Sequence, residues 1–109
     1  MAALEDGEPA QIAIDTGVDP TGAPIVILSG ELDSSNAGSL EAAVAPITAR
    51  LPERLIFDLS DLRFIDSAGI AVLIGVAGRV SAVRLRDPSP IVRRVIEITG
   101  LSEVLQIEA

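Results

Sequence analysis

The 109-residue sequence has no cysteine and no histidine, and its aromatic residues are two phenylalanines. Because cysteine is absent, a disulfide framework and thiol chemistry are both excluded. Because histidine is absent as well, the chain has neither a Ser-His-Asp relay nor a thiolate nucleophile. A cysteine-free chain fits the cytoplasm, where we expect this protein to act.

Cofactor-binding and metal-binding patterns are also missing. Gly69, Gly75 and Gly78 do not form a phosphate-binding GxxxxGK loop. Asp33, Asp58 and Asp66 are scattered along the chain, which is a weak pattern for a metal site. We therefore predict no cofactor, no metal site and no enzymatic activity.

Basic residues are scarce. Sixteen acidic residues stand against eight basic ones, and the formal net charge is -8. A nucleic-acid-binding protein needs a basic face, and an anionic membrane repels an acidic domain. The longest apolar run, residues 68–77, is far shorter than the roughly 20 residues that span a bilayer. We therefore expect protein partners, no nucleic acid and no membrane insertion, although the acidic charge also serves solubility.

The order of elements predicts the fold class. Residues 1–9 are expected to be a flexible N-terminal leader, and residues 10–109 a single domain with an aliphatic core. Strands are expected at 11–15, 25–28, 55–59, 82–86 and 104–107, and helices at 37–51, 68–77 and from Pro90 to a C-cap at Gly100. The resulting order, β-β-α-β-α-β-α-β, predicts an α/β domain with a mixed, mostly parallel sheet and helices packed on it. The first two strands are expected to form an antiparallel edge hairpin.

Apolar spacing predicts the buried faces of two helices. In the first, Pro46 is expected to kink or interrupt the helix around residues 42–45. In the last, Ile91, Val95 and Ile98 are expected to face the core, with Val92 alongside. For the first helix the predicted buried residues are Leu40, Ala43, Val44, Ile47 and Leu51.

The most informative stretch is residues 55–78. It is predicted to run from an apolar strand through a polar connection at 60–63 and a tight turn into a helix that ends at Gly78. Ser67 lies just before the apolar helix and is the expected N-cap. Helical spacing predicts that the core-facing residues of this helix are Ile70, Leu73, Ile74 and Ala77.

The opposite face of that helix carries no charge. Its residues are expected to be Ala71, Val72, Gly75 and Val76. A surface helix normally turns polar residues outward, so this face is either buried by its own chain or a docking surface.

Several motifs carry a family resemblance from about Ile12 to Ile107. The segment Asp66-Ser67-Ala68-Gly69-Ile70 resembles the phosphorylation signature of STAS domains, and more narrowly that of bacterial anti-sigma factor antagonists. The supporting blocks, in chain order, are Gly30-Glu31-Leu32-Asp33, Phe57-Asp58-Leu59-Ser60, Phe64-Ile65, Pro88-Ser89-Pro90 and Ile98-Thr99-Gly100-Leu101.

The resemblance implies a regulatory cycle. The unphosphorylated domain would bind an anti-sigma factor that is also a serine kinase, and so free a sigma factor for transcription. The kinase would phosphorylate Ser67, binding would be lost, and a PP2C-type phosphatase would reverse the modification. An alternative is a STAS binding subunit of a transporter or sensory complex that is never phosphorylated.

Topology places further residues around Ser67. Strand carboxyl ends and helix N-termini share one edge of a mostly parallel sheet, so Asp33, Asp58 and Asp66 are expected near Ser67. A phosphate there would gain ~0.3–1 kcal/mol from the helix dipole and be repelled by the aspartates, so little change in fold is expected. The candidate partner-binding residues are Ala68, Gly69, Ala71, Val72, Gly75 and Val76, with Ser34 and Ser35.

Overall fold

The computed structural model describes residues 11–100 and 104–108. The predicted leader, residues 1–9, and Leu101 of the last motif lie outside the described residues. The elements follow the predicted order: β2 (Ile12–Val18), β3 (Pro24–Leu32), α1 (Ala37–Thr48), β4 (Arg54–Ile65), α2 (Ser67–Ala77), β5 (Ala82–Arg86), α3 (Pro90–Ile98) and β6 (Leu105–Glu108).

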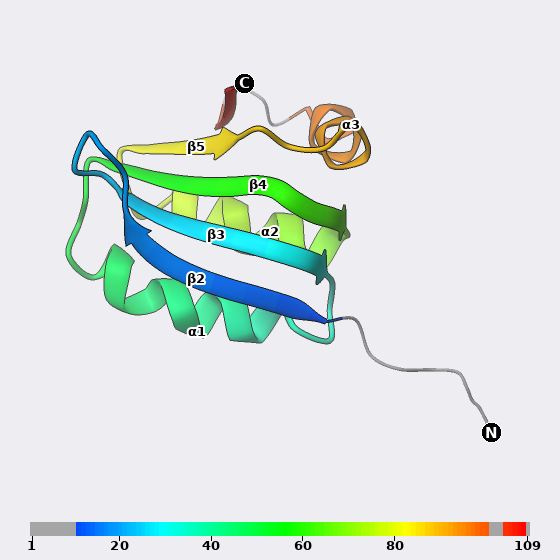
Figure 1. Ribbon diagram of the computed structural model, residues 1–109, viewed down its shortest axis with the longest axis horizontal. Coiled ribbons are helices and arrows are strands. Elements are labelled where there is room, and N and C mark those ends of the chain that lie inside the picture. Colours follow the sequence, from blue (N-terminus) through cyan, green and yellow to red (C-terminus); the bar gives the residue numbers. More distant parts are fainter. Residues whose placement is uncertain (1–10, 101–103, 109) are drawn as a thin grey trace.

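The strands form one five-stranded sheet in the order β2-β3-β4-β5-β6. Strand β2 runs antiparallel to β3, and every other neighbouring pair is parallel. Figure 1 shows α1 and α2 behind the sheet and α3 beyond the carboxyl end of β5. The predicted α/β architecture, with its antiparallel edge hairpin, is confirmed.

The core lies between the sheet and its helices and is aliphatic apart from Phe57. Residues Leu28, Phe57 and Leu85 of three adjacent strands are fully buried there, as are Leu40 and Leu73 of the two covering helices. Because successive strand residues point to opposite faces, Ile25 and Ile56 form a small separate cluster on the uncovered face with Ala23.

Strand β4 is longer than predicted, because the expected polar connection at 60–63 is part of it. Its pairing with β3 shifts register between Ile27 and Ser29, and again between Gly30 and Glu31. At each shift β4 carries one extra residue, the mark of a β-bulge. Ser60, Asp61 and Arg63 are exposed on this bulged part of the strand, so these polar residues do not need a loop.

Helix α1 continues past Pro46 to Thr48, so the predicted interruption is wrong. Pro46 lies in the last turn. The hydrogen bond that its missing N–H cannot donate to the Ala42 carbonyl is therefore lost near the end of the helix, where only Ile47 and Thr48 follow. Leu40 and Val44 are buried as predicted, but Leu51 lies beyond the helix with a φ of 52° and is 76% exposed.

Helix α3 bears out only part of its predicted buried face: Val92 is buried and Val95 packs partly against the core as expected, but Ile91 and Ile98 do not. Val92 and Ile96 are fully buried, whereas Ile91 is 63% and Ile98 is 75% exposed. Ser89 is the N-cap, with its hydroxyl oxygen accepting from the N–H of Val92. The predicted C-cap at Gly100 is one residue late: Thr99 is the C-cap, and Gly100 follows with a φ of 73°.

Candidate functional site

The N-terminus of α2 is capped by Asp66. Its Oδ1 accepts hydrogen bonds from the N–H groups of Ala68 at 2.9 Å and Gly69 at 3.1 Å. Ser67 is the first helical residue, so the prediction that Ser67 caps the helix is wrong. Strand β4 ends at Ile65 and leaves Asp66 in extended backbone, which is the conformation of an N-cap.

Ser67 is exposed, and its hydroxyl makes no hydrogen bond to another described residue. The turn below it is held firmly. The N–H of Asp66 donates to the carbonyl of Leu32 at 3.1 Å, which ties the end of β4 to the end of β3. Gly69 packs so closely on Leu32 and Ile65 that a Cβ there would come within 2.7 Å of Leu32. Ser67 is therefore presented to solvent from a rigid support.

Asp33 lies at the same sheet edge as Asp66. The register pairs Leu32 with Ile65, so the two aspartates follow neighbouring strand ends, as predicted. The Asp33 carboxylate accepts from the N–H of Ser35 at 2.8 Å and from its hydroxyl at 2.6 Å, which closes the turn before α1. Ser34 and Ser35 are exposed in this turn.

Asp58 does not belong to this group, and its predicted place near Ser67 is wrong. It lies in the middle of β4, paired with Ile27 and Arg86. Ile65 is seven residues further along the strand, which corresponds to roughly 23 Å. The Asp58 carboxylate bonds to the N–H and hydroxyl of Ser60 instead. The error follows from the predicted strand end at residue 59.

The exposed face of α2 is rotated relative to the predicted docking face. Val76 is only 1% exposed and Val72 packs against the core, so these two predicted surface residues are largely or wholly buried. Ile74, predicted to face the core, is 37% exposed. Ala71 is exposed as predicted and Gly75 is half-buried. Because this helix is apolar on every side, the spacing of its apolar residues does not indicate which side faces the core.

A shallow apolar groove of about 350 Å³ runs between α2 and α3, with Ser67 on its wall. We call it the α2–α3 groove. No charged side chain lines it. Sequence reasoning missed the contribution of α3, although the apolar spacing of Val95 and Ile98 was visible. The lining residues are Ser67, Ile70, Ala71 and Ile74 of α2 with Val95, Ile98 and Thr99 at the end of α3.

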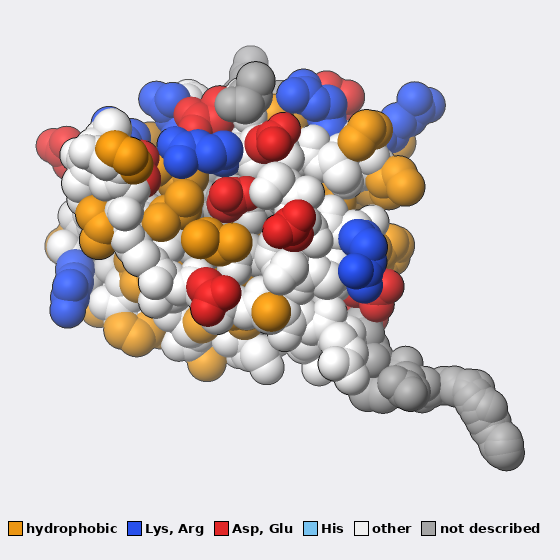
Figure 2. Space-filling view, viewed as in Figure 1, with side chains coloured by type: hydrophobic (Ala, Val, Ile, Leu, Met, Phe, Trp, Pro, Cys, Tyr) orange, Lys and Arg blue, Asp and Glu red, His pale blue; other side chains and the backbone are white. Residues whose placement is uncertain are grey.

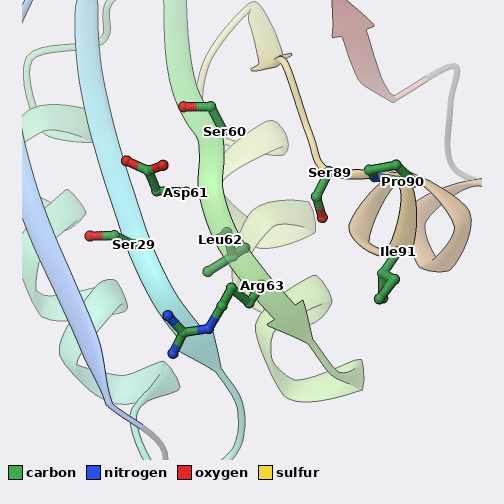
Figure 3. Close-up of a pocket in the computed structure, with 8 residues that line it drawn as sticks. All are labelled: Ser29, Ser60, Asp61, Leu62, Arg63, Ser89, Pro90 and Ile91. Carbon is green, nitrogen blue, oxygen red and sulfur yellow. The ribbon is translucent and has the colours of Figure 1, made fainter.

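A larger hollow of about 710 Å³ lies elsewhere, between β4 and the start of α3, and shares no lining residue with the α2–α3 groove. Figure 3 shows it bounded by Leu62 and Arg63 of β4 on one side and by Ser89, Pro90 and Ile91 on the other. Arg63 pairs with Glu31 at 3.7 Å across the exposed sheet surface. In Figure 2, Asp and Glu side chains lie over the strands of the uncovered sheet face, so this surface is charged where the groove is apolar.

The ion pairs of Arg86 are structural. Its guanidinium bonds to Glu108 at 2.8 Å and to Asp19 at 3.4 Å. The hydrogen bond to Glu108 raises the pKa of Arg86. The pKa of Asp19 is lowered, chiefly by the hydrogen bond from the Thr21 hydroxyl, against the opposing effect of burial. This network joins β5, β6 and the β2–β3 turn.

Neither a metal cluster nor a membrane span occurs in the part of the chain that the structure describes. No three acidic side chains there are grouped so that they could hold a metal ion. No helix there has the length and apolarity that crossing a membrane requires.

The family model of the STAS domain matches residues 13–109. The chain belongs to the STAS domain family. The anti-sigma F factor antagonist of Paenibacillus polymyxa is 30% identical to this STAS domain over 91 residues, which are 79% of this chain and 78% of that relative. The match confirms the family that the motifs around Ser67 predicted.

Solved structures share the fold of this STAS domain. An anti-sigma factor antagonist from Mycobacterium paratuberculosis matches with a TM-score of 0.81 at 29% identity, over 89% of this chain and 85% of that one. The Bacillus protein SpoIIAA, at 22% identity, matches with a TM-score of 0.74 in its unphosphorylated form and 0.68 in its phosphorylated form. The match covers 89% of this chain in both forms, and 89% and 92% of the respective SpoIIAA chains.

Proposed function

We propose that this STAS domain is an anti-sigma factor antagonist. Unphosphorylated, it binds an anti-sigma factor serine kinase and thereby frees a sigma factor for transcription. Phosphorylation of Ser67 by that kinase ends binding, and a PP2C-type phosphatase restores it. The names of the relatives from Paenibacillus polymyxa and Mycobacterium paratuberculosis support the class of partner. The domain is a ligand and a substrate in this cycle and does no catalysis itself.

The observation that carries the proposal is the position of the Ser67 hydroxyl. It is exposed, makes no hydrogen bond to a described residue, and stands at the first position of a helix whose cap is another residue. A kinase can therefore reach the hydroxyl without breaking a contact that holds the fold. Ser60 is also exposed, but its hydroxyl donates to Asp58 at 2.7 Å.

Electrostatics explains why phosphate would end binding. A phosphoserine adds about -1.5 to -2 charges at pH 7. Here that charge would join Asp66 and Asp33 at one sheet edge, on a chain whose net charge is already -8. It would also stand on the wall of the apolar groove, where a partner would have to remove water from a dianion in order to dock.

Intact mass spectrometry tests the proposal. The chain is incubated with ATP and a purified anti-sigma factor serine kinase from the same organism, and we expect the mass of one phosphate. Ser67→Ala should abolish the mass shift, while Ser60→Ala, at another exposed serine, should leave it unchanged. Binding of the kinase should weaken at least tenfold in Ser67→Asp.

Two results would contradict this function. A phosphate that persists in Ser67→Ala would place the modification elsewhere. A stable complex with unchanged affinity in Ser67→Asp, together with no phosphorylation of wild type, would favour a constitutive STAS subunit of a transporter or sensory complex.

A further inference from the structure

Helix α3 carries two apolar stripes, and only one belongs to the core. Val92 and Ile96 are fully buried beneath the helix. Ile91, Val95 and Ile98, at positions i, i+4 and i+7, form a second stripe that is exposed at both ends. A helix on the surface normally turns charged residues outward at such positions. The two ends of the second stripe, Ile91 and Ile98, are therefore apolar surface that the domain leaves uncovered, while Val95 between them packs partly against the core.

Helix α2 provides the facing wall. Ser67, Ala71 and Ile74 lie at i, i+4 and i+7 on its exposed side, and Ile70 forms part of the wall beside them. The second stripe of α3 contributes Val95 and Ile98 to this same groove. Its remaining residue, Ile91, lines the separate hollow shown in Figure 3. Two of the three stripe residues, Val95 and Ile98, thus face the apolar wall of α2 beside Ser67.

Only two hydroxyls interrupt the apolar lining. Thr99 donates its hydroxyl to the carbonyl of Ile96 at 2.5 Å, so this group is satisfied within α3. The Ser67 hydroxyl has no such bond to a described residue. Of the two hydroxyls in the groove lining, that of Ser67 is consequently the one whose proton can be donated to a partner.

We infer that the anti-sigma factor docks in the α2–α3 groove with an apolar ridge bordered by basic residues. This inference rests on the proposed function and adds α3 to its interface. The apolar lining calls for aliphatic side chains on the partner. Asp66 and Asp33 at the Ser67 end, on a chain of net charge -8, call for basic residues around them. The same net charge disfavours a second copy of this chain as the occupant.

The groove also accounts for the switch without a change of fold. Ser67 is part of the wall, so a phosphate would stand within the docking surface rather than beside it. The partner's basic residues would face Asp66 and Asp33 at the rim of the groove. The apolar ridge that covers the groove wall would therefore remove water from the dianion without pairing its charge, which is strongly unfavourable. Release then requires no movement of α2.

Matched substitutions test the groove. Ile98 is 75% exposed, and Val18 is 71% exposed. Val18 is the control because it pairs with Pro24, the first residue of β3, whereas Ser67 lies at the edge where β3 ends. The dissociation constant of the unphosphorylated chain with the purified anti-sigma factor kinase is measured for Ile98→Asp and for Val18→Asp. We expect Ile98→Asp to weaken binding at least tenfold and Val18→Asp less than twofold. Ile98→Ser and Val18→Ser repeat the comparison without charge, and thermal melts of all four confirm folding.

The outcomes separate this inference from the proposed function. If wild type binds and Ile98→Asp binds equally well, the groove is wrong and the proposed function stands. If wild type neither binds the kinase nor is phosphorylated, the proposed function itself fails. If wild type sediments as a dimer that Ile98→Asp converts to a monomer, the groove is a self-association surface and the anti-sigma factor is not its occupant.

Discussion

Asp66 caps helix α2 and the neighbouring Ser67 does not, so substitutions at the two positions should differ in their effect on stability. Asp66 accepts two backbone N–H groups of α2, so Asp66→Ala leaves both without that partner. Losing an N-cap costs ~0.5–2 kcal/mol, and losing a carboxylate at a helix N-terminus ~0.3–1 kcal/mol. Because these contributions overlap, we expect Asp66→Ala to lower the free energy of unfolding by ~1–2 kcal/mol.

Two further variants separate the contribution of the Asp66 charge from that of its hydrogen bonds and from that of the Ser67 hydroxyl. Asp66→Asn keeps an acceptor and removes only the charge, so ~0.3–1 kcal/mol is expected. Ser67→Ala removes an exposed hydroxyl without an internal hydrogen bond, and should change stability by no more than ~0.5 kcal/mol.

Urea denaturation at pH 7 measures all three. With an m-value of ~2 kcal/mol/M, Asp66→Ala should move the midpoint by roughly 0.5–1 M, and the slope should stay that of wild type. A Ser67→Ala loss as large as that of Asp66→Ala would refute the assignment of Asp66 as the cap.

Two more predictions concern stability. Gly69→Ala would place a Cβ 2.7–2.8 Å from fully buried side chains of Leu32 and Ile65, an overpacking that costs ~1–3 kcal/mol. Its Tm should fall by ~4–8 °C per kcal/mol, and an unchanged melt by circular dichroism would contradict the close packing. Because hydrogen bonding, foremost from Thr21, lowers the pKa of Asp19 below 3.8, its stabilisation is complete above that value and is lost as the pH falls through the lower folded-state pKa. The Tm gap between wild type and Asp19→Asn should therefore close on acidification, whereas a gap constant with pH would contradict this linkage.

Local signals in the sequence predicted the elements well. Val83 and Leu85 alternate with arginines and are buried in β5, as the alternation indicated. Gly78 follows the last residue of α2, where the stop signal stood. These features depend on a few adjacent residues, so a single sequence contains them.

Predictions that needed the phase of an apolar helix failed. Helix α3 contains two interleaved stripes, and the one with Ile91 and Ile98 is as regular as the buried one with Val92 and Ile96. Only the position of the sheet decides between them. The same holds in α2, where Ile74 was predicted to be buried and is partly exposed, while Val76 was predicted on the opposite face and is buried.

The length of β4 was the other failure, and it displaced Asp58 from the candidate site. Ser60, Asp61 and Arg63 have the composition of a loop, yet they continue a strand because one side of the sheet is open to water. The start of α2 was predicted one residue late: Asp66, expected in the preceding turn, is the cap, and Ser67, the expected cap, is the first helical residue. Two adjacent residues that both favour an N-cap cannot be ranked without the strand end that precedes them.

The capping carboxylate has a consequence for any group attached to its neighbour. The open amides at the start of a helix are a common cradle for phosphate in proteins. In α2 two of those amides, from Ala68 and Gly69, already hold Asp66. A phosphoryl group on Ser67 would find these places taken and would stay hydrated at the surface. Its charge would therefore act on an approaching partner, because the helix N-terminus of its own domain would not neutralise it.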